Sequence, residues 1–141
     1  MAQEKDCKFC NWQEHYEKIW ESVHVVAVWG SPYVKGHIKI ILKRHADNLI
    51  ELSKEESHAL MDAWQIVGAA VEKVLKPDII NWQINGNWVR HIHGHIYPRW
   101  QSDKDWGEPI ALPTKIQDHS KDYKPKPLTD KEKKAILKLL K

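Results

Sequence analysis

The sequence predicts an α+β fold, in which one long helix packs on an antiparallel sheet of about five strands and a short C-terminal helix follows. Strand-like segments outnumber helical ones, and the short links between them favour antiparallel pairing. Only one long stretch, which starts near Ser53, has the apolar spacing of a helix. A length of 141 residues with 42% hydrophobic content is sufficient for one globular domain.

The first strand-like segments lie at residues 18–28 and 36–42. The segment from Lys18 to Val28 is rich in Val, Ile and Trp, and the sequence GHIKIIL at 36–42 alternates in the manner of a strand. The intervening GSPYVKG has the residue types of a turn-containing connection.

The clearest helix begins after Ser53. Ser53 and Glu56 have the spacing of a capping box, and Lys76-Pro77 ends the helix. The apolar positions between them follow helical spacing: Leu60, Ala63, Trp64, Val67, Ala70, Val71 and Val74.

A hairpin is predicted next, with residues 79–84 as one strand, Asn85-Gly86-Asn87 as a tight turn, and a histidine-rich returning strand. After Trp100 the composition becomes that of an exposed connection, and a second capping box at Thr129 and Glu132 starts a short basic helix. We therefore expect a catalytic unit at residues 1–102 and a C-terminal extension at 103–141, within a single domain.

Charge and cysteine content narrow the classes of partner. Lys+Arg 22 against Asp+Glu 19 is only a weak excess of positive charge, so we do not expect nucleic acid as the partner. Two cysteines, Cys7 and Cys10, are too few and too close together for a secreted disulfide framework. No apolar run reaches a membrane span, and the start lacks a signal-peptide core, so we expect a cytoplasmic protein that does not bind membranes.

The most informative stretch is HIHGHIYPRW at residues 91–100. On a regular strand, His91, His93 and His95 share one face, and the first and third Cα atoms are about 13 Å apart. A single zinc ion with bonds of about 2.0 Å cannot easily take all three, so the histidines are expected to have different roles. Gly94, which points to the other face, is expected to let another element approach closely.

Three imidazoles in a row suit phosphoryl chemistry. A neutral imidazole is a competent nucleophile, and its neighbours can orient it or meet phosphate oxygens. Two alternatives stay open on spacing alone: a surface strand with chance histidines, or a two-histidine metal site of the His-x-His kind.

The stretch HIHGHIYPR resembles the signature of the histidine-triad (HIT) superfamily, which alternates histidine with apolar residues and is commonly followed by Pro-Arg. CKFC at the start, GHIKIILKRHADNL at 36–49, the capped helix and NGNWVRH precede it in the family's order, so the similarity covers about residues 7–100. The resemblance implies a HIT-like fold and transfer of a nucleoside monophosphoryl group from a phosphoanhydride or phosphoramidate.

The same resemblance assigns roles to individual residues. His93 would be the nucleophile that forms a covalent nucleotidyl intermediate, and His95 would contact the phosphate and help to protonate the leaving group. His37 would lie close to the active site as one of the substrate-binding residues, and Asn87 would touch the phosphates. No catalytic metal would be needed, because His95, Asn87, backbone N–H groups and Arg90 would meet the phosphate charge.

This chain departs from the common pattern at several positions. The turn NGN is shorter than the usual Gly-rich loop, Trp29 stands where a ribose-binding acidic residue is frequent, Arg90 replaces a common proline, and Gly94 replaces an apolar residue. These differences concern the identity of the substrate more than the chemistry.

The cysteine pair is a candidate for part of a zinc site. Two thiolates at the Cys-x-x-Cys spacing can hold one tetrahedral zinc ion, but two more ligands are required. Metal-bearing members of the superfamily supply them from two histidines, and the matching residues in this chain are His45 and His91. The resemblance therefore implies a structural Cys2His2 site with Cys7 and Cys10. The alternative is a reduced pair of cysteines with His91 only hydrogen-bonded.

The leading hypothesis is a nucleotide hydrolase or nucleotidyl transferase that acts on dinucleoside polyphosphates or nucleoside phosphoramidates, with an adenine nucleotide as the expected ligand. One of Trp82, Trp88 and Trp100 could stack on the base. A phosphorylase variant and a non-catalytic, zinc-stabilised nucleotide-binding protein are the alternatives. Because so small a sheet cannot hide both its faces and edges, we also expect a homodimer.

Overall fold

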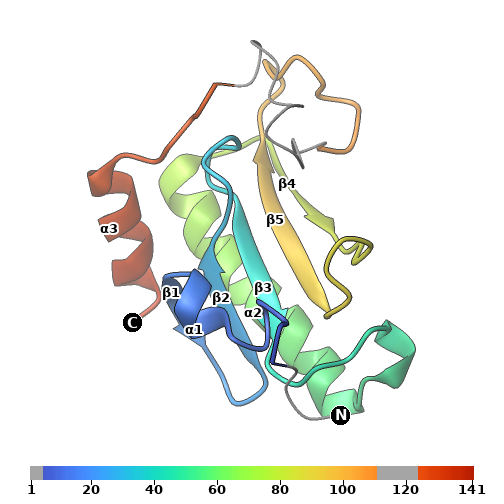
Figure 1. The fold of residues 1–141 in the computed structure, drawn as a ribbon. Coiled ribbons are helices and arrows are strands. Elements are labelled where there is room, and N and C mark those ends of the chain that lie inside the picture. The colour runs from blue at the N-terminus through green and yellow to red at the C-terminus, as the bar shows by residue number, and fades with distance from the viewer. Residues whose placement is uncertain (1–4, 111–123) are drawn as a thin grey trace.

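One antiparallel sheet with the strand order β1-β2-β3-β5-β4 forms the centre of the computed structural model, which describes residues 5–110 and 124–141 (Figure 1). The strands are β1 (Lys18–Glu21), β2 (Val25–Trp29), β3 (Ile38–Leu42), β4 (Ile79–Gln83) and β5 (His93–Arg99). The helices are α1 (Trp12–His15), α2 (Lys54–Leu75) and α3 (Asp130–Leu139), and a 3-10 turn lies at Leu49–Glu51. The predicted α+β class, with five antiparallel strands, one long helix and a short C-terminal helix, is confirmed.

Helix α2 covers one face of the sheet. The Ser53 hydroxyl accepts a hydrogen bond from the Glu56 amide, and the Glu56 carboxylate accepts one from the Ser53 amide, so the predicted capping box is present. Lys76 ends the helix in the left-handed conformation, with φ at 51°. Strand residues that alternate toward α2 form the main core with it, among them Val25, Ala27, Ile38, Ile40 and Ile96.

The C-terminal helix α3 packs beside α2. Its N-terminus carries the predicted capping box of Thr129 and Glu132, and Ile136 is fully buried in the main core. Of the predicted C-terminal extension, residues 111–123 lie outside the described residues.

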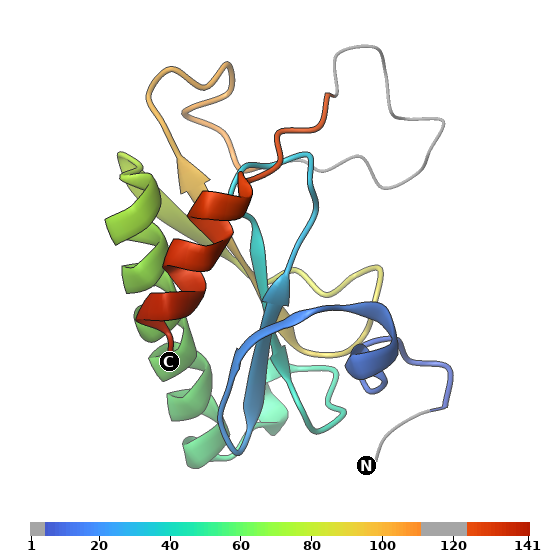
Figure 2. The same cartoon turned by 90° about the vertical axis from the view of Figure 1, so that its left-hand side faces the viewer.

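The opposite face of the sheet is covered by the N-terminal segment and α1, so the sheet lies between α2 and α1 (Figure 2). A second, smaller core joins Phe9 of this segment to Val26, Val28 and Ile41 of β2 and β3. Helix α1, which the sequence did not predict, follows a tight turn at Cys7–Asn11 in which the Asn11 amide donates to the Cys7 carbonyl.

Three local expectations were wrong. Residues 18–28 form two strands, β1 and β2, because a turn at 22–24 folds the chain back and the Ser22 amide donates to the Val25 carbonyl. Asn85-Gly86-Asn87 is part of a longer loop at residues 84–92, not a tight turn. His91 lies in that loop and not on the returning strand, which begins at His93.

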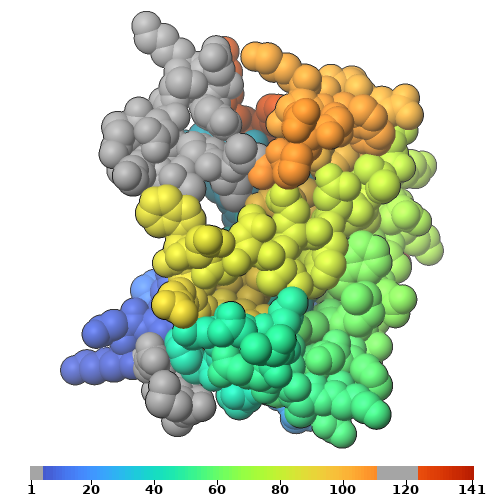
Figure 3. Space-filling view, turned by 90° about the vertical axis from the view of Figure 1, so that its right-hand side faces the viewer, coloured from blue at the N-terminus to red at the C-terminus, as the bar shows by residue number. Residues whose placement is uncertain are grey.

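The loop before β5 is held by β3 and by the segment after it rather than by β4. The Ile92 amide donates to the Ala46 carbonyl, and the Ile92 carbonyl accepts from the Leu42 amide. Figure 3 shows this loop (yellow) lying directly over the residues that follow β3 (teal). Among the residues described, no helix has the length and apolar character needed to cross a membrane.

Candidate active site and metal cluster

Two neighbouring strands carry the histidine cluster on the sheet face opposite α2. His93 and His95 alternate along β5, and His37, immediately before β3, shares a face with Lys39. The antiparallel register places His95 opposite Lys39 and His93 opposite Ile41. The structure therefore brings together His37, His93 and His95, three of the residues that the sequence proposed for catalysis and substrate binding.

His93 is buried, and one of its ring nitrogens is committed to the backbone. Its Nδ1 lies 2.6 Å from the His91 carbonyl oxygen, and because a carbonyl can only accept, Nδ1 carries the proton. The lone pair of the neutral ring is then on Nε2. Burial is the main cause that lowers the pKa of His93 to about 4. The hydrogen bond to the His91 carbonyl acts to raise this pKa, and the positive charge of Lys39 lowers it further. At pH 7 the ring is therefore neutral, with a nucleophilic Nε2.

His37 and His95 form a hydrogen-bonded pair with a defined polarity. The Ser31 amide donates to His37 Nδ1 at 2.7 Å, so His37 carries its proton on Nε2. That Nε2 lies 2.9 Å from His95 Nδ1 and donates to it, which leaves the proton of neutral His95 on its own Nε2. Tyr97 stacks on both rings. His95 is thereby fixed as a donor at Nε2.

Burial also keeps this pair uncharged. It lowers the pKa of His37 to about 2 and that of His95 to about 3, and in each case the charge of a neighbouring histidine adds to the effect. The rings of His93 and His95 have centroids 5.0 Å apart. The arrangement thus sets a nucleophilic nitrogen beside a hydrogen-bond donor, which is a combination suited to attack on an anionic phosphorus centre.

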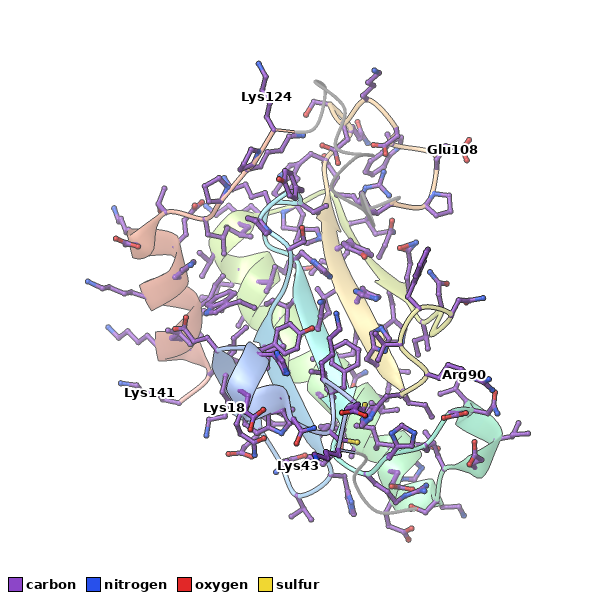
Figure 4. The ribbon with its side chains drawn as sticks, viewed as in Figure 1. Lys18, Lys43, Arg90, Glu108, Lys124 and Lys141 are labelled. Atoms are coloured by element: carbon purple, nitrogen blue, oxygen red, sulfur yellow. The ribbon has the colours of Figure 1, made fainter. Side chains whose placement is uncertain are left out.

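Other predicted site residues lie elsewhere. Asn87 is an exposed residue of the 84–92 loop. Arg90 also projects from this loop, toward the segment after β3 (Figure 4), and its guanidinium lies 3.3 Å from the Asp47 carboxylate. Trp82 and Trp100 pack against the main core on the α2 side, and Trp88 is 73% exposed. Gly94 does allow a close approach, since a Cβ there would collide with the ring of Trp82.

Trp29 stands where the family pattern has a ribose-binding acidic residue. Trp29 lines a small hollow together with His37 and residues 126–128 and 133 of the C-terminal segment. A Cβ at Gly30 would collide with the His37 ring. A residue larger than glycine therefore does not fit at position 30 beside His37.

Four residues around the histidines were missed by the sequence reasoning. The Phe9 ring centroid lies 4.3 Å from that of His93, and Lys39 contacts the rings of both Phe9 and Tyr16. The fourth residue is Tyr97. Lys39 and Tyr97 could have been found by extending the strand alternation by two residues from His37 and His95, whereas no local signal indicates the contacts of Phe9 and Tyr16.

Cys7, Cys10, His45 and His91 form a second cluster, in which one ligand atom from each lies within 4.8 Å of the others. His91 Nδ1 lies 3.3 Å from Cys7 Sγ and 3.2 Å from His45 Nδ1, which in turn lies 3.3 Å from Cys10 Sγ. The predicted metal-binding residues are therefore brought together.

The ring orientations of this cluster fit a cation. His91 Nε2 is directed at the Leu42 carbonyl, and His45 Nε2 lies 3.4 Å from an Asp47 oxygen, so both protons point away from the cluster. Two Nδ1 lone pairs then face each other at 3.2 Å, which is repulsive without a positive ion between them. Tetrahedral zinc with bonds of about 2.0 Å to nitrogen and 2.3 Å to sulfur requires ligand atoms roughly 3.3–3.8 Å apart, close to the distances here.

Comparisons with known proteins agree with this geometry. The family model described as HIT domain matches residues 13–102. The chain is 32% identical over 108 residues to an uncharacterised HIT-like protein of Saccharolobus solfataricus, covering 70% of this chain and 78% of that protein.

Two relatives with named activities match over shorter stretches. One is named AP-4-A phosphorylase, from Mycobacterium tuberculosis, and is 30% identical over 81 residues, which is 53% of this chain and 42% of that protein. The other is named bis(5'-adenosyl)-triphosphatase, from Dictyostelium discoideum, and is 32% identical over 77 residues, or 51% and 52% of the two chains.

A solved structure of a zinc-bound histidine triad family protein from Mycobacterium smegmatis has a TM-score of 0.69 to this chain. The match covers 96% of this chain and 93% of that one at 21% identity, so the likeness concerns the fold.

Proposed function

This chain belongs to the HIT domain family, and on that premise we propose that it is a nucleotide hydrolase that works through a covalent nucleotidyl-histidine intermediate on His93. The observation that carries the proposal is the hydrogen bond from His93 Nδ1 to the His91 carbonyl, which leaves the lone pair on Nε2, beside His95. The two relatives with named activities support nucleotide phosphate chemistry for the family.

The first step forms one bond and breaks one. The Nε2 lone pair of His93 forms a P–N bond to the α-phosphorus of the nucleotide, and the bond from that phosphorus to its bridging atom breaks. The electron pair goes to the leaving group. His93 then carries a positive charge, with Nδ1–H still directed at the His91 carbonyl, and the Nε2–H of His95 donates to an oxygen of the transferred phosphoryl group.

The second step restores the enzyme. Water attacks the phosphorus, the P–N bond breaks, and its electron pair returns to His93 Nε2. One proton of the water is lost to solvent, and the nucleoside monophosphate leaves. If inorganic phosphate took the place of water, the product would be a nucleoside diphosphate, and the relative named AP-4-A phosphorylase is the reason to test that variant.

The fixed tautomers favour dinucleoside polyphosphates over phosphoramidates as substrates. A nucleoside polyphosphate leaves as a phosphate anion and needs no proton, whereas an amine leaving group does. His95 Nε2 holds a proton that it could give to an amine. Its Nδ1, however, accepts the hydrogen bond from His37 and cannot take up a second proton to replace the one that is lost, so His95 is a poor acid for an amine leaving group. An adenine nucleotide is the expected ligand because the relatives with named activities are named for adenosine phosphates.

Structural zinc is the second part of the proposal. Cys7, Cys10, His45 and His91 would hold it, with Asp47 and the Leu42 carbonyl as partners of the two imidazole N–H groups. When bound, zinc would link the N-terminal segment to the residues that lead into β5. Reduced cysteines are needed for such a site, which suits the cytoplasm. We further propose a homodimer, because β1 and β4 are edge strands of the sheet and could pair with another chain.

The experiment is AMP release from diadenosine tetraphosphate and from an adenosine phosphoramidate, with wild type, His93→Ala and the exposed control His58→Ala on α2. Wild type and the control should release AMP and should both trap acid-labile labelled nucleotide, whereas His93→Ala should do neither. Equal background rates in all three proteins would leave a non-catalytic nucleotide-binding protein. Addition of inorganic phosphate and a search for ADP would identify a phosphorylase.

A further inference from the structure

Lys39 places an ammonium group on the same face as the histidine cluster. It follows His37 by two residues on β3 and lies opposite His95 in the sheet register. Its Nζ lies 4.7 Å from the ring centroid of Tyr16 and 5.6 Å from that of Phe9, and 3.5 Å from the Tyr16 hydroxyl. Among the residues that the structure describes, no carboxylate lies within ion-pair distance of this ammonium.

A half-buried cation without a carboxylate is costly. Burial lowers the pKa of Lys39 to about 8, and the charge of Lys8 adds to this, so the group is still mostly charged at pH 7. The two aromatic rings offset only part of the lost hydration. An anion that arrives with a ligand would provide the missing compensation.

The same ammonium lies close to the reacting groups. The Phe9 ring contacts both Lys39 and His93, with centroids of Phe9 and His93 4.3 Å apart. After burial itself, the positive charge of Lys39 is among the causes that lower the pKa of His37, His93 and His95. The field of this lysine therefore acts where the phosphoryl group would be bound.

We propose that Lys39 binds the phosphate of the nucleotide and compensates its negative charge beside His93. This inference rests on the proposed function and narrows its ligand class to phosphate esters whose binding depends on their charge. A purely structural Lys39 would instead only hold Phe9 and Tyr16 in place, and its loss would affect charged and uncharged ligands equally.

The test compares AMP with adenosine, which lacks the phosphate, by titration calorimetry at pH 7.5 with wild type, Lys39→Met, Lys39→Arg and Lys73→Met. Lys73 is an exposed lysine of α2, on the other side of the sheet, and serves as the matched control. Lys39→Met should weaken AMP binding by about 10-fold or more and leave adenosine within about 2-fold, while Lys39→Arg should restore most of the affinity. Because the substitution removes a poorly solvated charge, the melting temperature should not fall.

Proton uptake provides a readout that packing cannot imitate. At pH 8.5 Lys39 is partly neutral in the free protein, and a bound phosphate favours its charged form, so AMP should bind with net proton uptake in wild type and with less in Lys39→Met. Calorimetry in two buffers of different ionisation enthalpy measures this uptake. The comparison with Lys39→Met is needed because other titratable groups surround the lysine: Lys8, Tyr16, His37, His93 and His95.

The outcomes separate this inference from the proposed function. If Lys39→Met binds AMP as tightly as wild type, or loses AMP and adenosine in equal proportion, the role of Lys39 is refuted while His93-dependent turnover by wild type stands. If wild type neither binds AMP nor releases it from any substrate, both proposals are refuted.

Discussion

The Nε2 atom of His37 lies 2.9 Å from Nδ1 of His95 and donates to it, because the Ser31 amide occupies the other nitrogen of His37. This bond fixes which nitrogen of His95 is presented to a ligand. We therefore expect His37 to be a positioning residue, which acts on the proposed site through His95.

Replacement of His37 by Phe keeps a ring against Tyr97 and His95 but removes the donor. Without this donor, His95 Nε2–H is no longer directed at the phosphoryl group. Loss of one directed hydrogen bond to an anion typically lowers a rate or affinity by about 10-fold to 100-fold, so we expect kcat for AMP release from diadenosine tetraphosphate to fall by that factor. AMP affinity should change much less. A fall in affinity as large as the fall in kcat would mean that the variant damages the site generally.

Stability should decrease as the pH falls from 7.5 to 5. The pKa values of His37 and His95 are lowered to about 2 and about 3, below the value of about 6.5 in the unfolded chain, so between these limits only the unfolded state takes up the protons. For each such histidine, the free energy of unfolding falls by at most about 1.4 kcal/mol per pH unit in this window. The pKa values of Glu21 and Glu56 are lowered to about 2 from the ordinary value of 4.5. These two carboxylates therefore lose their stabilising effect only once the pH falls below 4.5.

Urea unfolding at pH 7.5, 6 and 5 measures this slope. His37→Phe should show a weaker dependence on pH than wild type, by roughly one proton, whatever its stability at pH 7.5. Parallel curves for the two proteins would show that His37 becomes protonated in the folded state.

Local patterns in the sequence account for much of the fold. The capping boxes at Ser53 and Thr129 start helices α2 and α3, because two backbone N–H groups in each box are satisfied by side chains three residues apart. The Cys-x-x-Cys pair and the histidines at 45 and 91 were matched through the family pattern, and they meet in space.

Contacts between distant segments account for what was missed. A regular strand was expected to begin at His91, but its ring faces Cys7 and His45, and the backbone beside it pairs with the segment after β3. Lys39 is one residue of an ordinary strand pattern, and its significance depends on Phe9 and Tyr16, which lie more than twenty residues earlier. Such pairings are set by tertiary packing, which local propensity does not encode.

The metal cluster predicts a paired result for two histidines. His45→Gln removes a ligand directed at the cluster, whereas His58→Gln changes an exposed residue of α2. Purified wild type and His58→Gln should each contain about one zinc ion per chain, and His45→Gln should contain little, because a structural site needs four ligands. A chelator should lower the melting temperature of the first two proteins only. Zinc-free wild type, purified without chelators, would contradict the proposal.

Two glycines with opposite surroundings give the last prediction. A Cβ at Gly94 of β5 would collide with the Trp82 ring, whereas a Cβ at Gly68 of α2 has no atom within 4 Å. Gly94→Ala should therefore lower the free energy of unfolding by about 1–3 kcal/mol. Gly68→Ala should raise it by about 0.5–1 kcal/mol, because alanine loses less backbone entropy in a helix.

Urea denaturation of both variants measures these changes, and a second substitution tests their cause. Trp82→Leu removes the atoms that the new methyl group would meet, so Gly94→Ala should cost much less in the Trp82→Leu background than in wild type. An undiminished cost in that background would show that the glycine is required for its backbone and not for the space that it leaves to Trp82. Because Gly94 separates His93 from His95 on β5, the same variant should also reduce AMP release.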